Sequence, residues 1–256
     1  MTEFLEAVNA EIMAILGDEC LFSHDDGPHD KNNDLSNSSK NLRTHMERGG
    51  DDTGAVFPLT FSLNGDSYQS DLGFNAHHIL PADAAVNKAK QLLKLMKKQG
   101  DGDLKGDIGY GVNHRKNGVF LPTDDKWDVA QFGKWSAVMK KQDGYQLLYA
   151  YAYAAMKRTG RQFHTGHPDY SRWVLQRLEE IKVKMLESNR DCKQNKCTKK
   201  KPWNPPYNLV GKLDSISQHV RGYLTGSPRR WLSPIVTSPE AEFYGVGITP
   251  EKMAAI

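Results

Sequence analysis

The stretch Asn75-Ala76-His77-His78-Ile79-Leu80-Pro81 is the most informative part of this sequence for fold and function. It follows residues 56–63 and 68–74, which predict a β-hairpin because Asn64-Gly65 between them is a strong turn signal. Successive side chains of a strand point to opposite faces, so adjacent histidines can serve one site only where the strand ends. Pro81 predicts such an ending. One histidine could then hold a metal while the other acts on water; the alternative is two unrelated surface histidines.

A second histidine pair occurs in His164-Thr165-Gly166-His167-Pro168, directly before a helix predicted over residues 168–186. Two imidazoles three residues apart at a helix start can converge on one ion, with zinc, nickel, manganese or magnesium all open. The alternative is a capping or surface pair. Between the two pairs, Asn117-Gly118-Val119-Phe120-Leu121-Pro122 predicts a short strand after a turn. The three motifs together are more specific than either pair alone.

These motifs, which span residues 75–170, resemble the AHH family, a branch of the HNH/endonuclease VII nucleases. Members of that family are known as toxin domains of bacterial secreted effectors, including cargo of type VI secretion. The resemblance implies an α+β fold that is mainly helical, with a ββα-metal (His-Me finger) nuclease core. Residues 1–60 show no such resemblance.

The resemblance also implies roles for individual residues. His77, His164 and His167 would bind one divalent metal ion, His78 would be the general base that activates water, and the amide of Asn117 would pin the loop that carries the base. Imidazole ligands suit zinc or nickel, and magnesium or manganese could support activity. A neutral histidine can accept the proton of water near neutral pH.

The chain departs from the family pattern in two ways. Residues 123–163 separate the Asn-Gly strand from His164, where a compact ββα unit has a short turn, so a helical insertion over 123–160 is expected. His164 and His167 are three residues apart, where many ββα-metal nucleases use four. This spacing leaves open that one of the two lies outside the coordination sphere.

The expected function is a metal-dependent endonuclease (DNase) toxin, an interbacterial effector neutralised by a cognate, acidic immunity protein. One alternative is an RNase toxin on the same fold. Another is a non-catalytic nucleic-acid-binding module with a structural metal, although structural zinc sites are closed by four ligands, usually rich in cysteine. His114 is a candidate phosphate contact. Four cations beside the motifs are further candidate nucleic-acid contacts: Arg115, Lys116, Arg161 and Arg172.

Composition and charge set the remaining expectations. Hydrophobic residues make up 38% of the 256 residues and charged residues 25%, with net charge +3, which is typical of a globular protein. No apolar run approaches the roughly 20 residues of a membrane helix. The acidic start, Met1–Glu6, lacks the basic region of a secretory signal. We therefore expect synthesis in the bacterial cytoplasm, secretion without a cleaved signal through a secretion machinery component, and action in the target-cell cytoplasm.

Cysteines and lysines add two weaker expectations. Cys20, Cys192 and Cys197 are too few for a disulfide framework; the last two could be a zinc pair, but reduced thiols are the simpler reading. A lysine cluster could neutralise phosphates or be a solvated loop: Lys193, Lys196, Lys199, Lys200 and Lys201.

Hydrophobic periodicity predicts helices over 2–16, 83–98, 127–158 and 209–223. The polar stretch 23–54, with His24, His29 and His45, predicts a loosely ordered arm. We therefore expect an N-terminal helix and arm over 1–55 and a nuclease domain over 56–256.

Overall fold

The computed structural model describes residues 2–17, 31–51, 55–98, 100, 102–138, 144–190 and 201–253. Several residues singled out in the sequence lie outside these ranges, namely the three cysteines, His24, His29, Lys193, Lys196, Lys199 and Lys200. The chain forms two compact units. Unit 1 comprises residues 1–45, 78–118 and 171–220, and unit 2 comprises 46–77, 119–170 and 221–256. The predicted division near residue 55 remains a prediction.

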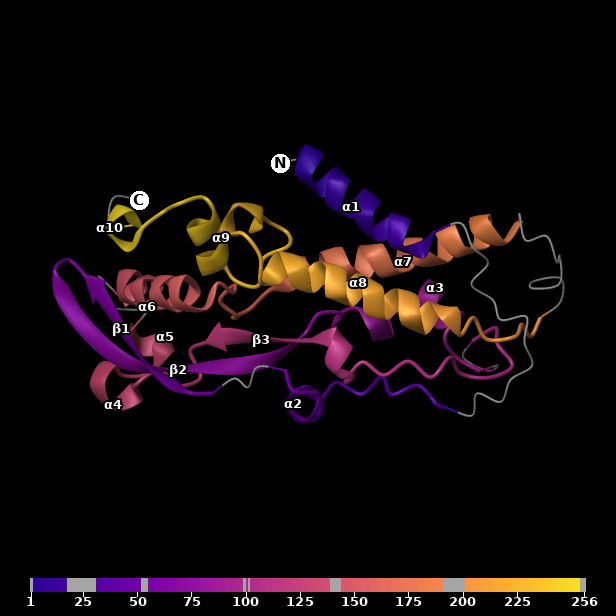
Figure 1. Ribbon diagram of the computed structural model, residues 1–256, viewed down its shortest axis with the longest axis horizontal. Helices are drawn as coiled ribbons and strands as arrows, with labels where there is room; N and C mark the ends of the chain where they lie inside the picture. Colours follow the sequence, from indigo (N-terminus) through magenta and orange to yellow (C-terminus); the bar gives the residue numbers. More distant parts are fainter. Residues whose placement is uncertain are drawn as a thin grey trace. The chain divides into compact units, whose positions relative to one another are not determined.

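The strands of the described residues form one three-stranded sheet in the order β1-β2-β3, and helices make up most of the remaining structure (Figure 1). β1 (Phe57–Leu63) pairs antiparallel with β2 (Asp66–His78), with Leu63 opposite Asp66. β3 is Gly118–Thr123. Asn64 and Gly65 both have positive φ, 53° and 90°, which is the backbone that a two-residue hairpin turn requires. The predicted hairpin and the short third strand are confirmed, and the fold is α+β.

The core of unit 2 forms on one face of the hairpin because alternate residues of β1 are buried there, including Leu59 and Phe61. The ring of Phe61 lies 5.6 Å from that of Tyr151, on α6 (Gly144–Thr159), and α6 runs beside β1 (Figure 1). The Tyr151 hydroxyl donates to the carbonyls of Asp71 at 3.0 Å and Thr123 at 3.2 Å. These bonds tie the helix to β2 and β3.

The predicted single helix over 127–158 is wrong, because the chain breaks into α4 (Val129–Phe132), α5 (Trp135–Val138) and α6. Gly133 ends α4 with a φ of 82°, in the left-handed region. The indole of Trp127 donates to the Gly133 carbonyl at 3.0 Å, which fixes this turn. The rest of unit 2 includes η3 (Pro228–Arg230), α9 (Pro239–Gly245) and α10 (Pro250–Met253).

Unit 1 is mainly helical. α1 (Thr2–Leu16) matches its prediction and buries Val8, Ile12 and Leu16 at helical spacing. α7 (Pro168–Arg190) and α8 (Asn208–Leu224) begin or end in unit 2, and most of their residues belong to unit 1. The Trp173 indole donates to the Asn9 side chain at 3.2 Å, which joins α7 to α1. No helix of the described residues has the length and apolarity to cross a membrane.

Two other expectations for secondary structure are wrong. The helix predicted over 83–98 is reduced to η1 (Val86–Lys88) and α3 (Lys90–Leu93), because Ala89 between them has a ψ of 71°, outside the helical range. Within the stretch predicted as a loose arm, residues 39–48 form α2 (Ser39–Arg48), with Leu42 and Met46 buried. Two apolar side chains were too sparse a pattern to predict that helix.

Candidate active site

The two adjacent histidines occupy the last positions of β2, His77 at the end of a segment of unit 2 and His78 at the start of a segment of unit 1. Both side chains are buried, with 4% and 7% of their surface exposed. β2 ends at His78, three residues before Pro81, as the sequence predicted. Consecutive strand residues point to opposite faces, and the two rings accordingly have different partners.

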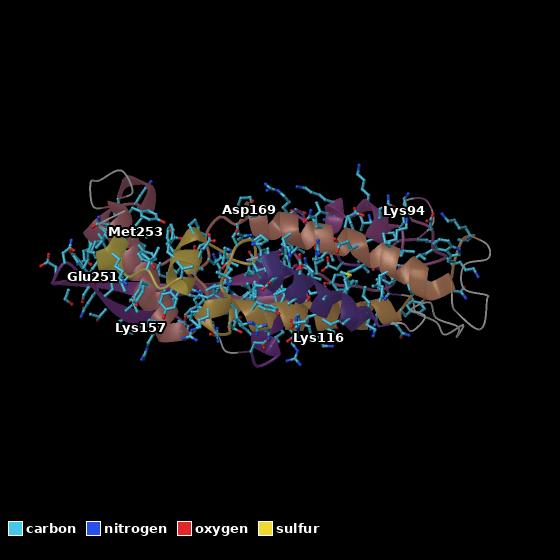
Figure 2. The ribbon with its side chains drawn as sticks, turned by 90° about the horizontal axis from the view of Figure 1, so that it is seen from above. Lys94, Lys116, Lys157, Asp169, Glu251 and Met253 are labelled. Carbon is cyan, nitrogen blue, oxygen red and sulfur yellow. The ribbon has the colours of Figure 1, made fainter. Side chains whose placement is uncertain are left out.

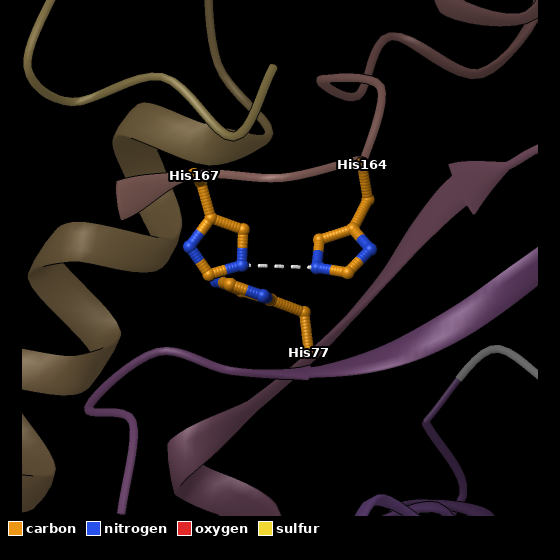
Figure 3. A group of neighbouring side chains, drawn as sticks. All are labelled: His77, His164 and His167. Carbon is orange, nitrogen blue, oxygen red and sulfur yellow. Dashed lines mark hydrogen bonds between the residues drawn. The ribbon is translucent and has the colours of Figure 1, made fainter. Parts of the chain in front are cut away.

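His77 lies in a cluster with His164 and His167, all three in unit 2 (Figure 3). One ring nitrogen from each lies within 4.8 Å of the others. The Nε2 atoms of His164 and His167 are 3.2 Å apart. The ring of His77 lies 4.9 Å from each of the other two. The structure thus brings together the three residues predicted as metal ligands, despite the helical insertion and the three-residue spacing.

The segment that carries His164 is fixed by hydrogen bonds within unit 2. The His164 amide donates to the Pro122 carbonyl at 2.8 Å, which aligns the segment with β3. The Thr165 amide donates to the Thr237 carbonyl at 3.0 Å. Gln162 is fully buried, accepts from the Thr237 amide at 2.8 Å and donates to the Ile235 carbonyl at 3.1 Å. Gln162 and Thr237 are supporting residues that no pattern in the sequence indicated.

Tyr170, on the first turn of α7, forms one wall of the cluster. Its fully buried ring lies 5.4 Å from that of His77 and 5.5 Å from that of His167. Burial raises the pKa of its hydroxyl well above the usual value. The side chain is therefore neutral and contributes shape and low polarity to the site.

The cluster favours neutral imidazoles. Burial, with a smaller contribution from His167, lowers the pKa of His164 to about 4. Burial also lowers the pKa of His167. At neutral pH the rings of His164 and His167 can therefore each offer a nitrogen lone pair, which is the form that binds a cation.

The donor set and its spacing fit a bound divalent ion. Two nitrogens bound to one zinc at their usual distance, in tetrahedral geometry, lie roughly 3.3 Å apart. The 3.2 Å between the Nε2 atoms of His164 and His167 agrees with that value. Among the described residues the cluster offers three imidazoles, which suit zinc or nickel and are fewer than the four protein ligands of a structural zinc site.

His78 has a different environment, within unit 1. Its Nε2 lies 2.9 Å from the side-chain oxygen of Asn113. Burial lowers its pKa, while the hydrogen bond to Asn113 and the charge of Asp83 act in the opposite direction. His78 is therefore neutral at neutral pH and has the protonation state of a base.

Asn117 clamps the chain that follows His78. Its fully buried amide accepts from the Leu80 backbone N–H at 2.7 Å and donates to the Leu80 carbonyl at 3.0 Å. It also donates to the Val112 carbonyl at 2.9 Å and accepts from the Ser217 hydroxyl at 3.1 Å. A side chain that satisfies both backbone groups of Leu80 holds the exit of β2 in one conformation.

The four candidate nucleic-acid contacts do not form one group. Arg161, in unit 2, donates to the Phe120 carbonyl at 3.1 Å and lies over the Phe74 ring, so its head group has a structural role. The others belong to unit 1, where Lys116 (labelled in Figure 2) pairs with Asp214 at 3.0 Å. Arg115, Arg172 and His114 are exposed.

In the three-histidine cluster, His77 is buried and His164 and His167 are half-buried, and the residue after His77 is a neutral histidine. This arrangement defines a candidate metallohydrolase site. Residues 61–212, more than half of the chain, match the AHH family, described as a nuclease family of the HNH/ENDO VII superfamily with conserved AHH. The chain belongs to this family, and Ala76-His77-His78 is its AHH tripeptide. Neither the curated proteins nor the solved structures contain a match to the chain.

Proposed function

We propose that this nuclease is a metal-dependent endonuclease that hydrolyses DNA. The observation that carries the proposal is the convergence of His77, His164 and His167 in a chain that belongs to a nuclease family. The rings of His164 and His167 are neutral near pH 7, and three imidazoles suit one divalent ion. Zinc or nickel fits these ligands best, and magnesium or manganese are alternatives in catalysis.

The roles of the side chains follow from their environments. When bound, the ion would neutralise charge on the phosphate and on the leaving oxygen. His78 takes a proton from the attacking water, because a buried neutral imidazole is a competent base near neutral pH. Asn117 keeps the residues after His78 in place through its bonds to Leu80. His77, His164 and His167 hold the ion and take no part in proton transfer.

Plasmid cleavage by the purified protein tests this proposal. We expect the wild type to cleave after a divalent metal is added and to stop when EDTA is present, while His78→Ala is inactive with every metal. His219→Ala is the matched control, because His219 is a half-buried histidine that pairs with Glu11 within unit 1. Full cleavage by His78→Ala would refute the assignment of the base.

Parallel reactions with single-stranded and double-stranded RNA decide the polymer. Metal-dependent cleavage of RNA and not DNA would make the protein an RNase with the same site. Tight metal and nucleic-acid binding without cleavage of either polymer would identify a non-catalytic binding module.

We further propose that the nuclease is a toxin delivered between bacteria, neutralised by a cognate acidic immunity protein. In this proposal the chain is made in the bacterial cytoplasm, leaves through a secretion machinery, and acts in the cytoplasm of the target cell. The support is the kinship with the AHH family and the sequence pI of about 8.6, which favours an acidic partner. Expression in a bacterial cytoplasm should arrest growth with loss of cellular DNA, and His78→Ala should relieve it. Arrest that persists with His78→Ala would contradict a nuclease toxin.

A further inference from the structure

The most completely hydrogen-bonded side chain beside His78 is Asn113, which neither the sequence motifs nor the family description indicated. It is 1% exposed and lies in unit 1 together with every partner described below. Its side-chain oxygen lies 2.9 Å from His78 Nε2 and accepts from the Ser38 backbone N–H at 3.3 Å. Its amide nitrogen donates to Asp34 at 3.0 Å and to the Ser36 carbonyl at 2.9 Å.

These partners fix the orientation of the Asn113 amide. If the amide were flipped, its oxygen would face the Asp34 carboxylate and the Ser36 carbonyl, which are both acceptors. Its NH2 group would then face the Ser38 N–H, which is a donor. Only the orientation with the oxygen toward His78 satisfies the whole network, so the group that His78 Nε2 meets is an acceptor.

The backbone around this network is also held in place. Asp34 and the segment that carries Asn113 are joined by two backbone hydrogen bonds, from Asp34 to Tyr110 at 2.9 Å and from Val112 to Asp34 at 2.9 Å. His45 Nδ1 contacts the Asn113 carbonyl at 2.8 Å. Asp34 is exposed, so its charge is screened by water, and its main effect is to orient the Asn113 amide.

We infer that Asn113 is a positioning residue that holds His78 as the Nε2–H tautomer and leaves Nδ1 as the basic nitrogen. Because Asn113 presents an oxygen, the proton of the neutral ring must lie on Nε2, where it is donated. This assignment rests on the proposed function only in naming His78 as the base. In the step itself, one O–H bond of water breaks and its proton goes to His78 Nδ1. The water oxygen forms the new bond to phosphorus while the bond from phosphorus to the leaving oxygen breaks. The leaving oxygen takes the electron pair of that bond and then a proton from solvent, and the imidazolium keeps its Nε2–H on Asn113.

The first test is the tautomer of His78 in the metal-free protein, measured by NMR on protein labelled with 15N-histidine. At about pH 8, where an ordinary histidine is neutral, long-range 1H–15N spectra distinguish protonated from bare ring nitrogens. His78 is assigned as the signal missing from His78→Gln. We expect a protonated Nε2 and a bare Nδ1. A protonated Nδ1 would overturn the inference, and this readout does not depend on whether the protein cleaves nucleic acid.

The second test compares kinetics in variants of the same network. Asn113→Leu keeps the approximate size of the side chain and removes the acceptor, so we expect mixed tautomers and a kcat lower by about 100-fold, with KM nearly unchanged. Asn33→Leu is the matched control. Asn33 precedes Asp34 in the chain, and its side chain bonds to the Met96 carbonyl and the Tyr110 N–H. A similar loss of kcat in both variants would show a structural effect and overturn the positioning role.

A swapped pair keeps the inference falsifiable if Asn113→Leu fails to fold. The double variant Asp34→Asn with Asn113→Asp preserves an acceptor toward His78 and a donor–acceptor pair between positions 34 and 113, and it loses the bond to the Ser36 carbonyl. We expect it to keep the Nε2–H tautomer and to be much more active than Asn113→Asp alone, in which two carboxylates face each other. Asp34→Asn alone should lower kcat by only roughly two- to fivefold, as for an exposed charge. If the wild type cleaves neither DNA nor RNA, the proposed function fails, and the tautomer measurement still decides the inference.

Discussion

His77 and His78 are joined by one peptide bond, yet they have opposite surroundings. His77 faces other rings, including those of His164, His167 and Tyr170. His78 faces an amide that is held by a carboxylate, a backbone carbonyl and a backbone N–H. A ring among other imidazoles suits a ligand, and a ring held by one oriented acceptor suits a base. The alternation of side chains along β2 produces this difference, since the two residues point to opposite faces.

Replacing each histidine separately should separate metal binding from proton transfer, and this is the largest effect that we expect. His78→Ala should lower kcat by about 10²- to 10⁴-fold, the usual contribution of a general base, and keep the metal content of the wild type. His77→Ala should lose both the metal and the activity. Metal content after dialysis, measured beside cleavage rates, checks both. Loss of bound metal in His78→Ala would abolish the distinction.

The buried side-chain amide of Gln162 supports the segment that carries His164. Gln162→Leu should lower the free energy of unfolding by about 2–4 kcal/mol, because it leaves the Thr237 N–H and the Ile235 carbonyl buried without a partner. Thermal denaturation measures this loss. Gln162→Leu should also weaken metal binding, because the Thr237 carbonyl accepts from the backbone N–H of Thr165, next to His164. Unchanged metal affinity would show that His164 is positioned without this support.

The metal-free cluster should make the protein sensitive to acid. An unfolded histidine has a pKa near 6.5, whereas burial lowers that of folded His164 to about 4. Between these two pKa values the unfolded state binds more protons than the folded state. The contribution of neutral His164 to the free energy of unfolding is therefore fully present above pH 6.5 and is lost as the pH falls. For His164 alone, the loss is about 2 kcal/mol by about pH 5.

Denaturant titrations in EDTA at several pH values measure this slope. His164→Gln should flatten this slope, because it removes the histidine whose pKa burial lowers. An identical slope in the wild type and in His164→Gln would place the acid sensitivity elsewhere.

The smallest effect should come from Lys116, whose exposed side chain pairs with Asp214. Lys116→Ala should change the free energy of unfolding by about 0.2–1 kcal/mol, the usual range for a surface ion pair. If Lys116 binds substrate phosphates, the variant should raise KM and reduce the dependence of KM on salt without changing kcat. An unchanged KM at low salt would remove Lys116 from the nucleic-acid interface.

Much of the local structure was predictable because its signals are short in range. Asn64-Gly65 predicted the hairpin, and the apolar spacing of residues 2–16 predicted α1. The prediction of one helix over 83–98 was wrong, because the chain leaves the helical conformation at Ala89 although the apolar residues around it are buried. Hydrophobic periodicity reports burial and does not detect such a break.

The sequence alone determined that two histidine pairs and an Asn-Gly strand occur in an order typical of AHH nucleases, and that the first pair ends a strand. Only the tertiary structure decided that His164 and His167 both reach His77, that Arg161 is held by the Phe120 carbonyl, and that Asn113 faces His78. The first kind of information is carried by neighbouring residues, whose turn and strand preferences act locally. The second depends on hydrogen bonds and packing between residues far apart in the chain, such as Asp34 and Asn113 or Gln162 and Thr237, and spacing along the sequence does not encode those partners.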